Sequence, residues 1–340
     1  MITNIHHAED PDGIISAALL QRYQQTALGN SVLQASLVPK SINVPARYDR
    51  LVESFSSLLE VVQKENISPV YVADINPNPH LMKSGLVEQL AQAAEIHWID
   101  HHTGTEQQQE YFSKMGIQVT YDATKCASLL LVRTLNLTSP YLQRLAKIAQ
   151  LHDYHSNSKD TDSPEAKLGV ELEKIICLAN AHEDAFILRR LIEDLSVGSC
   201  FYEDELQPQW RHLANEYDHE KVNALRGLEN SIELVKVKNY QVLIAHAPAL
   251  LSQKPAIWYL KQKDPDILVC FFQPPCRNHI LDKRKDVPLD VPALCTAFGG
   301  GGRGTGGGFS VSEDLTPERY VQLKEQILQK IETGLPAVSE

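Results

Sequence analysis

Four short blocks rich in aspartate and histidine occur in the first half of this chain, and each follows or ends an apolar run. In chain order they are "HHAEDPDG", "VADINP", "IDHHT" and "AQLHDY". Carboxylates and imidazoles at the ends of strands are how proteins commonly hold divalent cations against phosphate. The pattern therefore favours a fold in which distant strand and helix ends meet at one point.

The first part of the chain alternates short apolar runs with amphipathic stretches, the first of which follows the opening block. This alternation is typical of βαβ units around a parallel sheet. The sequence predicts an α/β fold with strands at residues 36–43, 68–75, 96–100 and 117–122.

The remainder of the chain divides into a helical stretch and a second α/β region. Residues 165–237 are charged and of helical pattern, which favours a solvated connector. Strands of high β propensity follow at 240–248 and 266–275, and Thr316 is a suitable N-cap for a closing helix. We therefore expect a parallel-sheet domain, a helical connector, and a smaller C-terminal α/β domain with a glycine-rich loop, at residues 1–165, 166–237 and 238–340.

The charge of the chain limits its partners. Its 340 residues include 32 Lys and Arg and 43 Asp and Glu, which gives a net charge of −11. Binding to long duplex DNA requires a basic surface, so we expect no such partner. A short phosphorylated ligand remains compatible with this charge, because bound metal ions can supply a local positive field.

The six cysteines are scattered without a CxxC pair, which suits reduced thiols better than a disulfide framework. The N-terminal residues lack the pattern of a signal peptide, and no apolar run approaches 18 residues. We expect a cytoplasmic protein without a membrane segment, and a homodimer stays open.

The blocks differ in what each residue can do. His6, Asp10 and Asp12 have the spacing H-x3-D-x-D before a helix, although D-x-D-G is also a common turn composition. Asp74 ends an apolar strand. Asp153 lies at the end of a helical run, where the helix dipole disfavours a carboxylate and therefore a helix-stabilising role. A contact with His152 or with solvent is the alternative explanation for this residue.

Taken together and in this order, the blocks resemble motifs I to IV of the DHH phosphoesterase superfamily, in its RecJ-like and nano-RNase-like branch. The run "FGGGGRGTGGGF" at 298–309 is similar to the GGGGH segment of the C-terminal domain associated with DHH proteins. A phosphate-binding P-loop is excluded, because Thr305 stands where its lysine belongs. The resemblance covers most of residues 1–157 and 240–312.

The resemblance implies a centre with two Mn²⁺ or Mg²⁺ ions. One ion would be held by His6 and Asp10, and Asp74 would bridge it to the other. The second ion would be held by Asp12, His101 and Asp153.

The resemblance also implies roles around the ions. His102 would face the scissile phosphate and, with Asp100, is expected to act in catalysis. Asp100 could instead orient the ligating imidazole. His7 would be structural or lie in the outer shell of the centre.

In the C-terminal domain the resemblance implies close contact between substrate and the backbone of Gly299, Gly300, Gly301 and Gly302. Arg303 departs from the pattern, since the family usually has histidine there, and arginine can clamp a phosphate. Arg284, in the basic cluster 283–285, is a further candidate for phosphate contact. A solvated surface turn explains that cluster equally well.

These expectations indicate a metal-dependent phosphodiesterase, exonuclease-like, that hydrolyses short oligonucleotides or small nucleotides by two-metal activation of water. A phosphoanhydride hydrolase acting on pyrophosphate or polyphosphate is an alternative. A non-catalytic nucleotide-binding protein on the same fold is another, and Arg303 is the residue that keeps it open.

Overall fold

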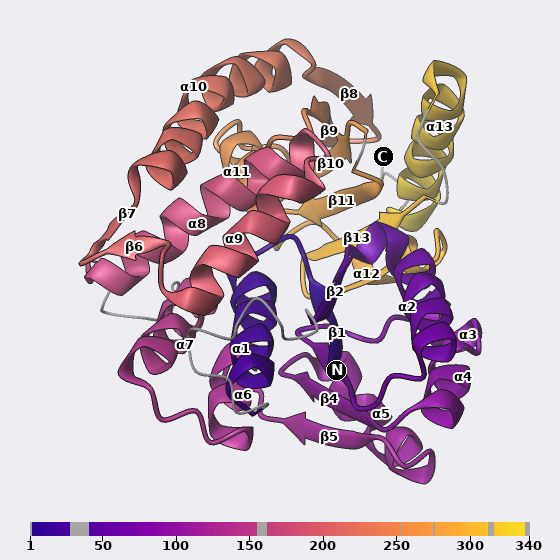
Figure 1. The fold of residues 1–340 in the computed structure, drawn as a ribbon. Coiled ribbons are helices and arrows are strands. Elements are labelled where there is room, and N and C mark those ends of the chain that lie inside the picture. Colours follow the sequence, from indigo (N-terminus) through magenta and orange to yellow (C-terminus); the bar gives the residue numbers. More distant parts are fainter. Residues whose placement is uncertain are drawn as a thin grey trace. The chain divides into compact units, whose positions relative to one another are not determined.

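The computed structural model describes residues 2–27, 41–154, 162–251, 253–274, 276–311 and 316–336 (Figure 1). The chain separates into two compact units. The first comprises Met1–Ala179 and Asp184–Asn215, and the second comprises Asn180–Glu183 and Glu216–Glu340. Residues of the expected connector are thus divided between the two units, and the three-part division stays a prediction.

A five-stranded parallel sheet forms the centre of the first unit. Its strand order is β2-β1-β3-β4-β5, and every neighbouring pair is parallel. The strands are β1 Thr3–His7, β2 Ile42–Ala46, β3 Val70–Ala73, β4 Ile96–Asp100 and β5 Gln118–Tyr121. The α/β prediction is confirmed.

Strand β2 differs from the strand expected at 36–43. It begins at Ile42 and continues through Pro45, and residues 36–40 lie outside the described part of the chain. Proline lacks a backbone donor, and β2 is at the edge of the sheet, where proline is tolerated.

Helices pack against the sheet in two separate hydrophobic clusters. One cluster draws on the helices α1 Pro11–Ala27, α6 Ala127–Thr134, α7 Pro140–Asp153, α8 Pro164–Ala181 and α9 Ala185–Val197. The other draws on α2 Leu51–Glu65, α3 Pro79–Lys83, α4 Leu86–Ala93 and α5 Thr103–Lys114. Helices α8 and α9 bury Leu172, Ile176 and Leu191 in the first cluster, so they are part of this core and do not lie free in solvent.

Two smaller elements complete the first unit. The 3-10 helix Tyr48–Arg50 follows β2, and the strands β6 Phe201–Tyr202 and β7 Glu205–Leu206 form a short hairpin. The long helix α10, Pro208–Asn230, then leads into the second unit.

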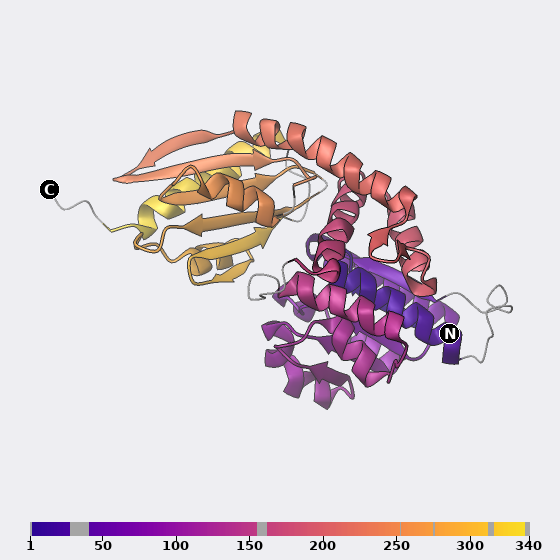
Figure 2. The same ribbon diagram turned by 90° about the vertical axis from the view of Figure 1, so that its left-hand side faces the viewer.

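The second unit is built on a six-stranded mixed sheet, of order β12-β13-β11-β10-β9-β8. Only β9 and β10 pair in parallel, with α11 Gln253–Lys261 between them in sequence. The helix α13, Pro317–Gly334, packs on this sheet through Ile327 and Ile331 (Figure 2). The remaining elements are β8 Glu233–Val237, β9 Tyr240–Ala247, β10 Ile267–Phe272, β11 Asn278–Lys283, α12 Val291–Thr296, β12 Gly301–Arg303 and β13 Gly306–Ser310. The side chain of Thr316 accepts a hydrogen bond from the backbone of Arg319, which confirms the expected N-cap.

The glycine run forms an ordered hairpin in which β12 and β13 approach very closely. A Cβ on Gly300 would lie 2.0 Å from the carbonyl oxygen of Gly308, and one on Gly302 would lie 2.3 Å from that of Gly306. Gly304 turns the chain with φ of 62°, a conformation that favours glycine. Several glycines of this run are therefore required by strand packing alone.

No helix within the described residues is long and apolar enough to cross a membrane.

Candidate metal centre

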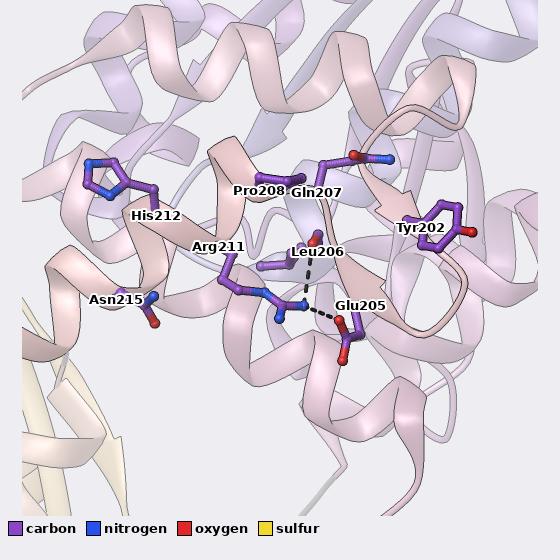
Figure 3. A pocket seen from close by; sticks show the side chains of 8 residues that line it. All are labelled: Tyr202, Glu205, Leu206, Gln207, Pro208, Arg211, His212 and Asn215. Atoms are coloured by element: carbon purple, nitrogen blue, oxygen red, sulfur yellow. Dashed lines mark hydrogen bonds and ion pairs between the residues drawn. The ribbon is translucent and has the colours of Figure 1, made fainter.

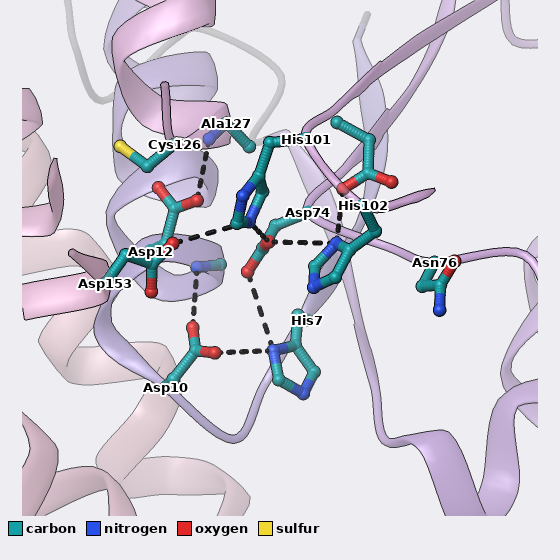
Figure 4. Close-up of polar contacts among 12 residues, drawn as sticks. His7, Asp10, Asp12, Asp74, Asn76, His101, His102, Cys126, Ala127 and Asp153 are labelled. Atoms are coloured by element: carbon teal, nitrogen blue, oxygen red, sulfur yellow. Dashed lines mark hydrogen bonds and ion pairs between the residues drawn. The ribbon is translucent and has the colours of Figure 1, made fainter. Parts of the chain in front are cut away.

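Carboxylate and imidazole side chains meet at one edge of the parallel sheet (Figure 4). Strands β1, β3 and β4 are neighbours and parallel, so their carboxyl ends lie at the same edge. Three overlapping groups form there, and within each the ligand atoms lie within 4.8 Å of one another. The groups are His7, Asp10 and Asp74; Asp12, His101 and Asp153; and Asp74, Asp100, His101 and His102.

Asp74 belongs to two of these groups and faces them with different oxygens. Its Oδ1 lies 3.3 Å from Nε2 of His101, and its Oδ2 lies 3.5 Å from Nδ1 of His7. Asp74 directly follows β3 and is 1% exposed. Its φ of 58° is uncommon for a residue other than glycine. One carboxylate thus reaches two groups, which is the geometry that a bridging ligand requires.

The turn after β1 places two carboxylates at the start of α1. Asp10 accepts a hydrogen bond from the backbone N–H of Gly13 at 3.2 Å, and its other oxygen lies 2.9 Å from Nδ1 of His7. Gly13 is required by close packing, because a Cβ there would lie 1.9 Å from the carbonyl oxygen of His7. The sequence D-x-D-G therefore folds as a tight entry into α1.

Asp12 points instead to the start of α6. Its two oxygens accept hydrogen bonds from the backbone N–H groups of Ala127 and Ser128, at 2.7 and 2.8 Å. The fully buried carboxylate thereby caps α6 and stays close to His101 and Asp153.

The structure places His7, not His6, beside Asp10 and Asp74. Successive residues of a strand point to opposite faces, so the two histidines of β1 cannot both face these carboxylates. The expectation from sequence was the reverse, with His6 as ligand and His7 structural or in the outer shell. His7 is the last residue of β1, and this position is the sequence signal for which of the two rings lies beside Asp10 and Asp74.

His6 lies in a chain of side-chain hydrogen bonds. Its Nδ1 is 2.9 Å from Oδ1 of Asn4, whose amide donates to Asn43 at 2.5 Å, and Asn43 donates to Gln21 at 3.0 Å. Burial lowers the pKa of His6 to about 3, so the ring is neutral. Its Nε2 is buried and has no hydrogen-bond partner among the described residues.

The adjacent histidines after β4 have different partners. Nδ1 of His102 lies 2.7 Å from Asp100, whose other oxygen accepts a hydrogen bond from Thr105 at 2.5 Å. Asp100 therefore orients His102, and not the more buried ring of His101. Burial acts to lower the pKa of His102, but the hydrogen bond and charge of Asp100, together with Asp74, raise it above its usual value.

His101 contacts a tyrosine that the sequence analysis did not identify. Its Nε2 lies 3.3 Å from Asp153, and its Nδ1 lies 3.0 Å from the hydroxyl of Tyr154. Tyr154 follows Asp153 in the fourth block, "AQLHDY".

Burial and mutual proximity disfavour the ionised form of two carboxylates of the centre, Asp74 and Asp153. Burial, with the charges of Asp12, Asp10 and Asp74, raises the pKa of Asp153 to about 9. Burial and neighbouring carboxylates likewise raise the pKa of Asp74 well above its usual range. The pKa of Asp10 is lowered instead, because His7 outweighs the effect of burial.

These residues fit divalent cations. Oδ2 of Asp74 and Oδ2 of Asp153 are buried without a hydrogen-bond partner in the described structure, as expected of ligand atoms. The donors are mostly carboxylates with imidazoles, and no cysteine belongs to the described groups. Such a set suits hard or borderline cations such as Mg²⁺ and Mn²⁺.

The candidates in the second unit have less distinct surroundings. The guanidinium of Arg284 pairs with Asp286 at 2.7 Å and with Asp266 at 2.8 Å, which fits the surface-turn interpretation. A Cβ on Gly301 would meet nothing within 4 Å, so this glycine leaves open space beside the hairpin. Gly299 turns the chain with φ of 79°, and the side chain of Arg303 lies outside the described structure.

A hollow of about 470 Å³ lies elsewhere in the first unit, between the β6–β7 hairpin and the start of α10 (Figure 3). Arg211 pairs there with Glu205 at 2.7 Å. No residue of the three groups lines this hollow, and the Arg211 charge is already compensated, so we assign it no function.

No protein-family model matches the chain, and no curated protein matches its sequence. A solved DHH-domain structure, described as a member of the s1p family of ribosomal proteins, is similar with a TM-score of 0.64 and 13% identity, over 99% of this chain and 87% of that one. The chain shares the overall fold of this DHH-domain structure.

Two further solved structures resemble this DHH fold over nearly the whole chain. One is an exopolyphosphatase-related protein from Bacteroides fragilis, with 13% identity, a TM-score of 0.49, and coverage of 98% of this chain and 92% of that one. The other is a pGpG-specific phosphodiesterase from Vibrio cholerae, with 11% identity, a TM-score of 0.47, and coverage of 98% and 100%. The fold implied by the resemblance is confirmed by the similarity to the DHH-domain structure with the TM-score of 0.64.

Proposed function

We propose that this chain is a metal-dependent phosphodiesterase that hydrolyses short oligonucleotides or small nucleotides. The observation that carries the proposal is the position of Asp74, whose two oxygens face two separate groups of ligand atoms. Two cations held about 3.5–4 Å apart can activate a water molecule and stabilise the attacking and leaving oxygens of a phosphate.

The assignment of ligands follows the groups. His7 and Asp10 would hold one ion, Asp12, His101 and Asp153 would hold the other, and Asp74, whose two oxygens face both groups, would contribute to both. His7 takes the role that the sequence analysis gave to His6, because its ring is the one beside both carboxylates. Mn²⁺ is the proposed metal, and Mg²⁺ fits the same oxygen-rich donors.

His102 is the proposed contact to the substrate phosphate. Its Nδ1 is engaged by Asp100, which leaves Nε2 to face the substrate. The raised pKa of His102 favours a proton at Nε2, and that N–H would donate to a phosphate oxygen as charge develops there. Asp100 and Thr105 hold the ring in this orientation.

The proposed substrate is small. A net charge of −11 disfavours long duplexes, whereas a short oligonucleotide needs few phosphate contacts. The open side of Gly301 and the guanidinium of Arg303 are the proposed contacts in the second unit, while the ion pairs of Arg284 make it the weaker candidate there.

The experiment that tests the function is a substrate panel with Mn²⁺. It contains labelled oligonucleotides of two to about 24 residues, cyclic dinucleotides, 3′-phosphoadenosine 5′-phosphate and pyrophosphate. We expect turnover of phosphodiesters, fastest for the shortest, and none by an Asp74→Asn variant. Consumption of pyrophosphate alone would indicate the phosphoanhydride hydrolase. No consumption by a chain that binds Mn²⁺ would indicate a non-catalytic nucleotide-binding protein.

A further inference from the structure

The hydroxyl of Tyr154 lies between two fixed groups. Tyr154 follows the last residue of α7, and its oxygen is 3.0 Å from Nδ1 of His101 and 2.9 Å from the carbonyl oxygen of Ala123. The two rings are 5.9 Å apart. The hydroxyl thus connects the loop after β5 to the histidine that follows β4.

The number of available protons decides the direction of these hydrogen bonds. A tyrosine hydroxyl has one proton, and a backbone carbonyl can only accept. The proton of Tyr154 is therefore donated to Ala123, and its oxygen can meet His101 only as an acceptor. Nδ1 of His101 must then carry a hydrogen, and in the Nδ1–H tautomer Nε2 has the free lone pair.

That lone pair points to the metal centre. Nε2 of His101 lies 3.3 Å from Oδ1 of Asp74 and 3.3 Å from Oδ2 of Asp153. The opposite tautomer would place a hydrogen between these carboxylates and would prevent His101 from binding a cation. The choice of tautomer is therefore a condition for the ligand role of His101.

The loop that carries the Ala123 carbonyl is held in place by further hydrogen bonds. The side chain of Gln150 donates to the carbonyl of Thr124 at 3.3 Å and accepts from the backbone N–H of Cys126 at 2.8 Å. The backbone N–H of Thr124 also donates to Asp122 at 2.9 Å. These contacts fix the loop that presents the Ala123 carbonyl, so the direction of the Tyr154 proton does not depend on His101.

We propose that Tyr154 is a positioning residue of the metal centre, which selects the Nδ1–H tautomer of His101 and directs its Nε2 lone pair toward Asp74 and Asp153, with which His101 would hold a cation. The inference rests on the proposed two-metal function. Partners of this kind behind a ligating histidine commonly contribute 10- to about 100-fold in metal affinity.

The test compares Tyr154→Phe with wild type and with Tyr141→Phe. Tyr141 is a matched control, because it lies on α7, the helix that Tyr154 directly follows, and its hydroxyl also donates to a backbone carbonyl, that of Leu195, at 2.7 Å. Mn²⁺ binding is titrated calorimetrically without substrate. We expect Tyr154→Phe to weaken the binding of one ion about 10- to 100-fold, and Tyr141→Phe to leave affinity unchanged.

A second readout reports the tautomer directly. Nitrogen NMR of the metal-free protein should show His101 protonated at Nδ1 in the wild type and a mixture of tautomers in Tyr154→Phe. Equal Mn²⁺ affinity of wild type and Tyr154→Phe, or a wild-type ring protonated at Nε2, would overturn the proposal. Absence of Mn²⁺ binding by the wild type would overturn the proposed function instead, so the two failures are distinguishable.

Discussion

The histidines in and beside the centre differ mainly in their hydrogen-bond partners. His102 has a carboxylate behind it and an elevated pKa, whereas His101 has a neutral hydroxyl. His6 and His7 are adjacent in sequence, yet one joins an amide chain and the other joins two carboxylates. Sequence spacing alone could not separate this second pair, because a shift of one residue along a strand reverses the face.

The two histidines of β1 can be separated by substitution. We expect His7→Ala to weaken Mn²⁺ binding at least about tenfold, because it removes the ring beside Asp10 and Asp74. His6→Ala should instead lower the free energy of unfolding by about 1–3 kcal/mol, since it leaves Asn4 with an unpaired buried oxygen. Calorimetry and urea denaturation measure the two effects. Loss of Mn²⁺ binding in His6→Ala with unchanged stability would restore the ligand predicted from sequence.

The buried carboxylates make metal binding dependent on pH. Asp153 has a folded-state pKa of about 9, above its usual value, so the metal-free folded state binds more protons than the unfolded state between about pH 4 and 9. Stability of the metal-free protein should therefore fall as pH rises through this window, and Asp153→Asn should reduce that loss. A stability that increases with pH from 5 to about 9 would contradict the account.

The same shift predicts proton release when the centre is filled. Cation binding requires ionised Asp153 and Asp74, so at neutral pH it should expel at least about one proton and become tighter as pH rises toward 9. Calorimetric titrations in buffers with different ionisation enthalpies measure the number of protons. An affinity independent of both buffer and pH would show that these carboxylates are already ionised.

The sequence predicts a helix or strand correctly where the residues of that element alone determine its conformation. The strand expected at 96–100 is β4, because its short length and its β-branched and aromatic residues favour a strand over a helix. The stretch expected to be a solvated connector instead contributes α8 and α9 to a buried core. An amphipathic pattern identifies a helix but not the surface that covers it, and the β6–β7 hairpin is too short to give any periodic signal.

In the glycine hairpin, alanine substitution at two neighbouring positions should have different effects on stability. Gly300→Ala places a Cβ 2.6 Å from the Cα of Phe309, and should cost about 1–3 kcal/mol of stability. Gly301→Ala meets nothing within 4 Å and should cost less than about 1 kcal/mol. If Gly301 contacts substrate, its variant should raise KM without loss of stability. Equal destabilisation by both substitutions would contradict the observed packing of β12 on β13.

At the scale of the whole molecule, the order of the four blocks predicted the fold better than any block alone. Separate turns of aspartate and histidine are common, but a parallel sheet with β1, β3 and β4 as neighbours brings them together.

Charge is also a property of the whole chain. At physiological salt we expect faster hydrolysis of oligonucleotides of two to about five residues than of long duplexes, because a net charge of −11 repels extended phosphate backbones. Equal efficiency on long duplex DNA would contradict this expectation.

The bridging role of Asp74 is the central claim, and counting bound metal tests it most directly. Elemental analysis and electron paramagnetic resonance of the Mn²⁺-loaded chain should show two ions per chain with a spin-coupled signal. Asp74→Asn should lose the coupling and nearly all turnover, because no other side chain of the described groups faces both His7 and His101. A single uncoupled ion in the wild type, or full turnover by Asp74→Asn at saturating Mn²⁺, would contradict the account.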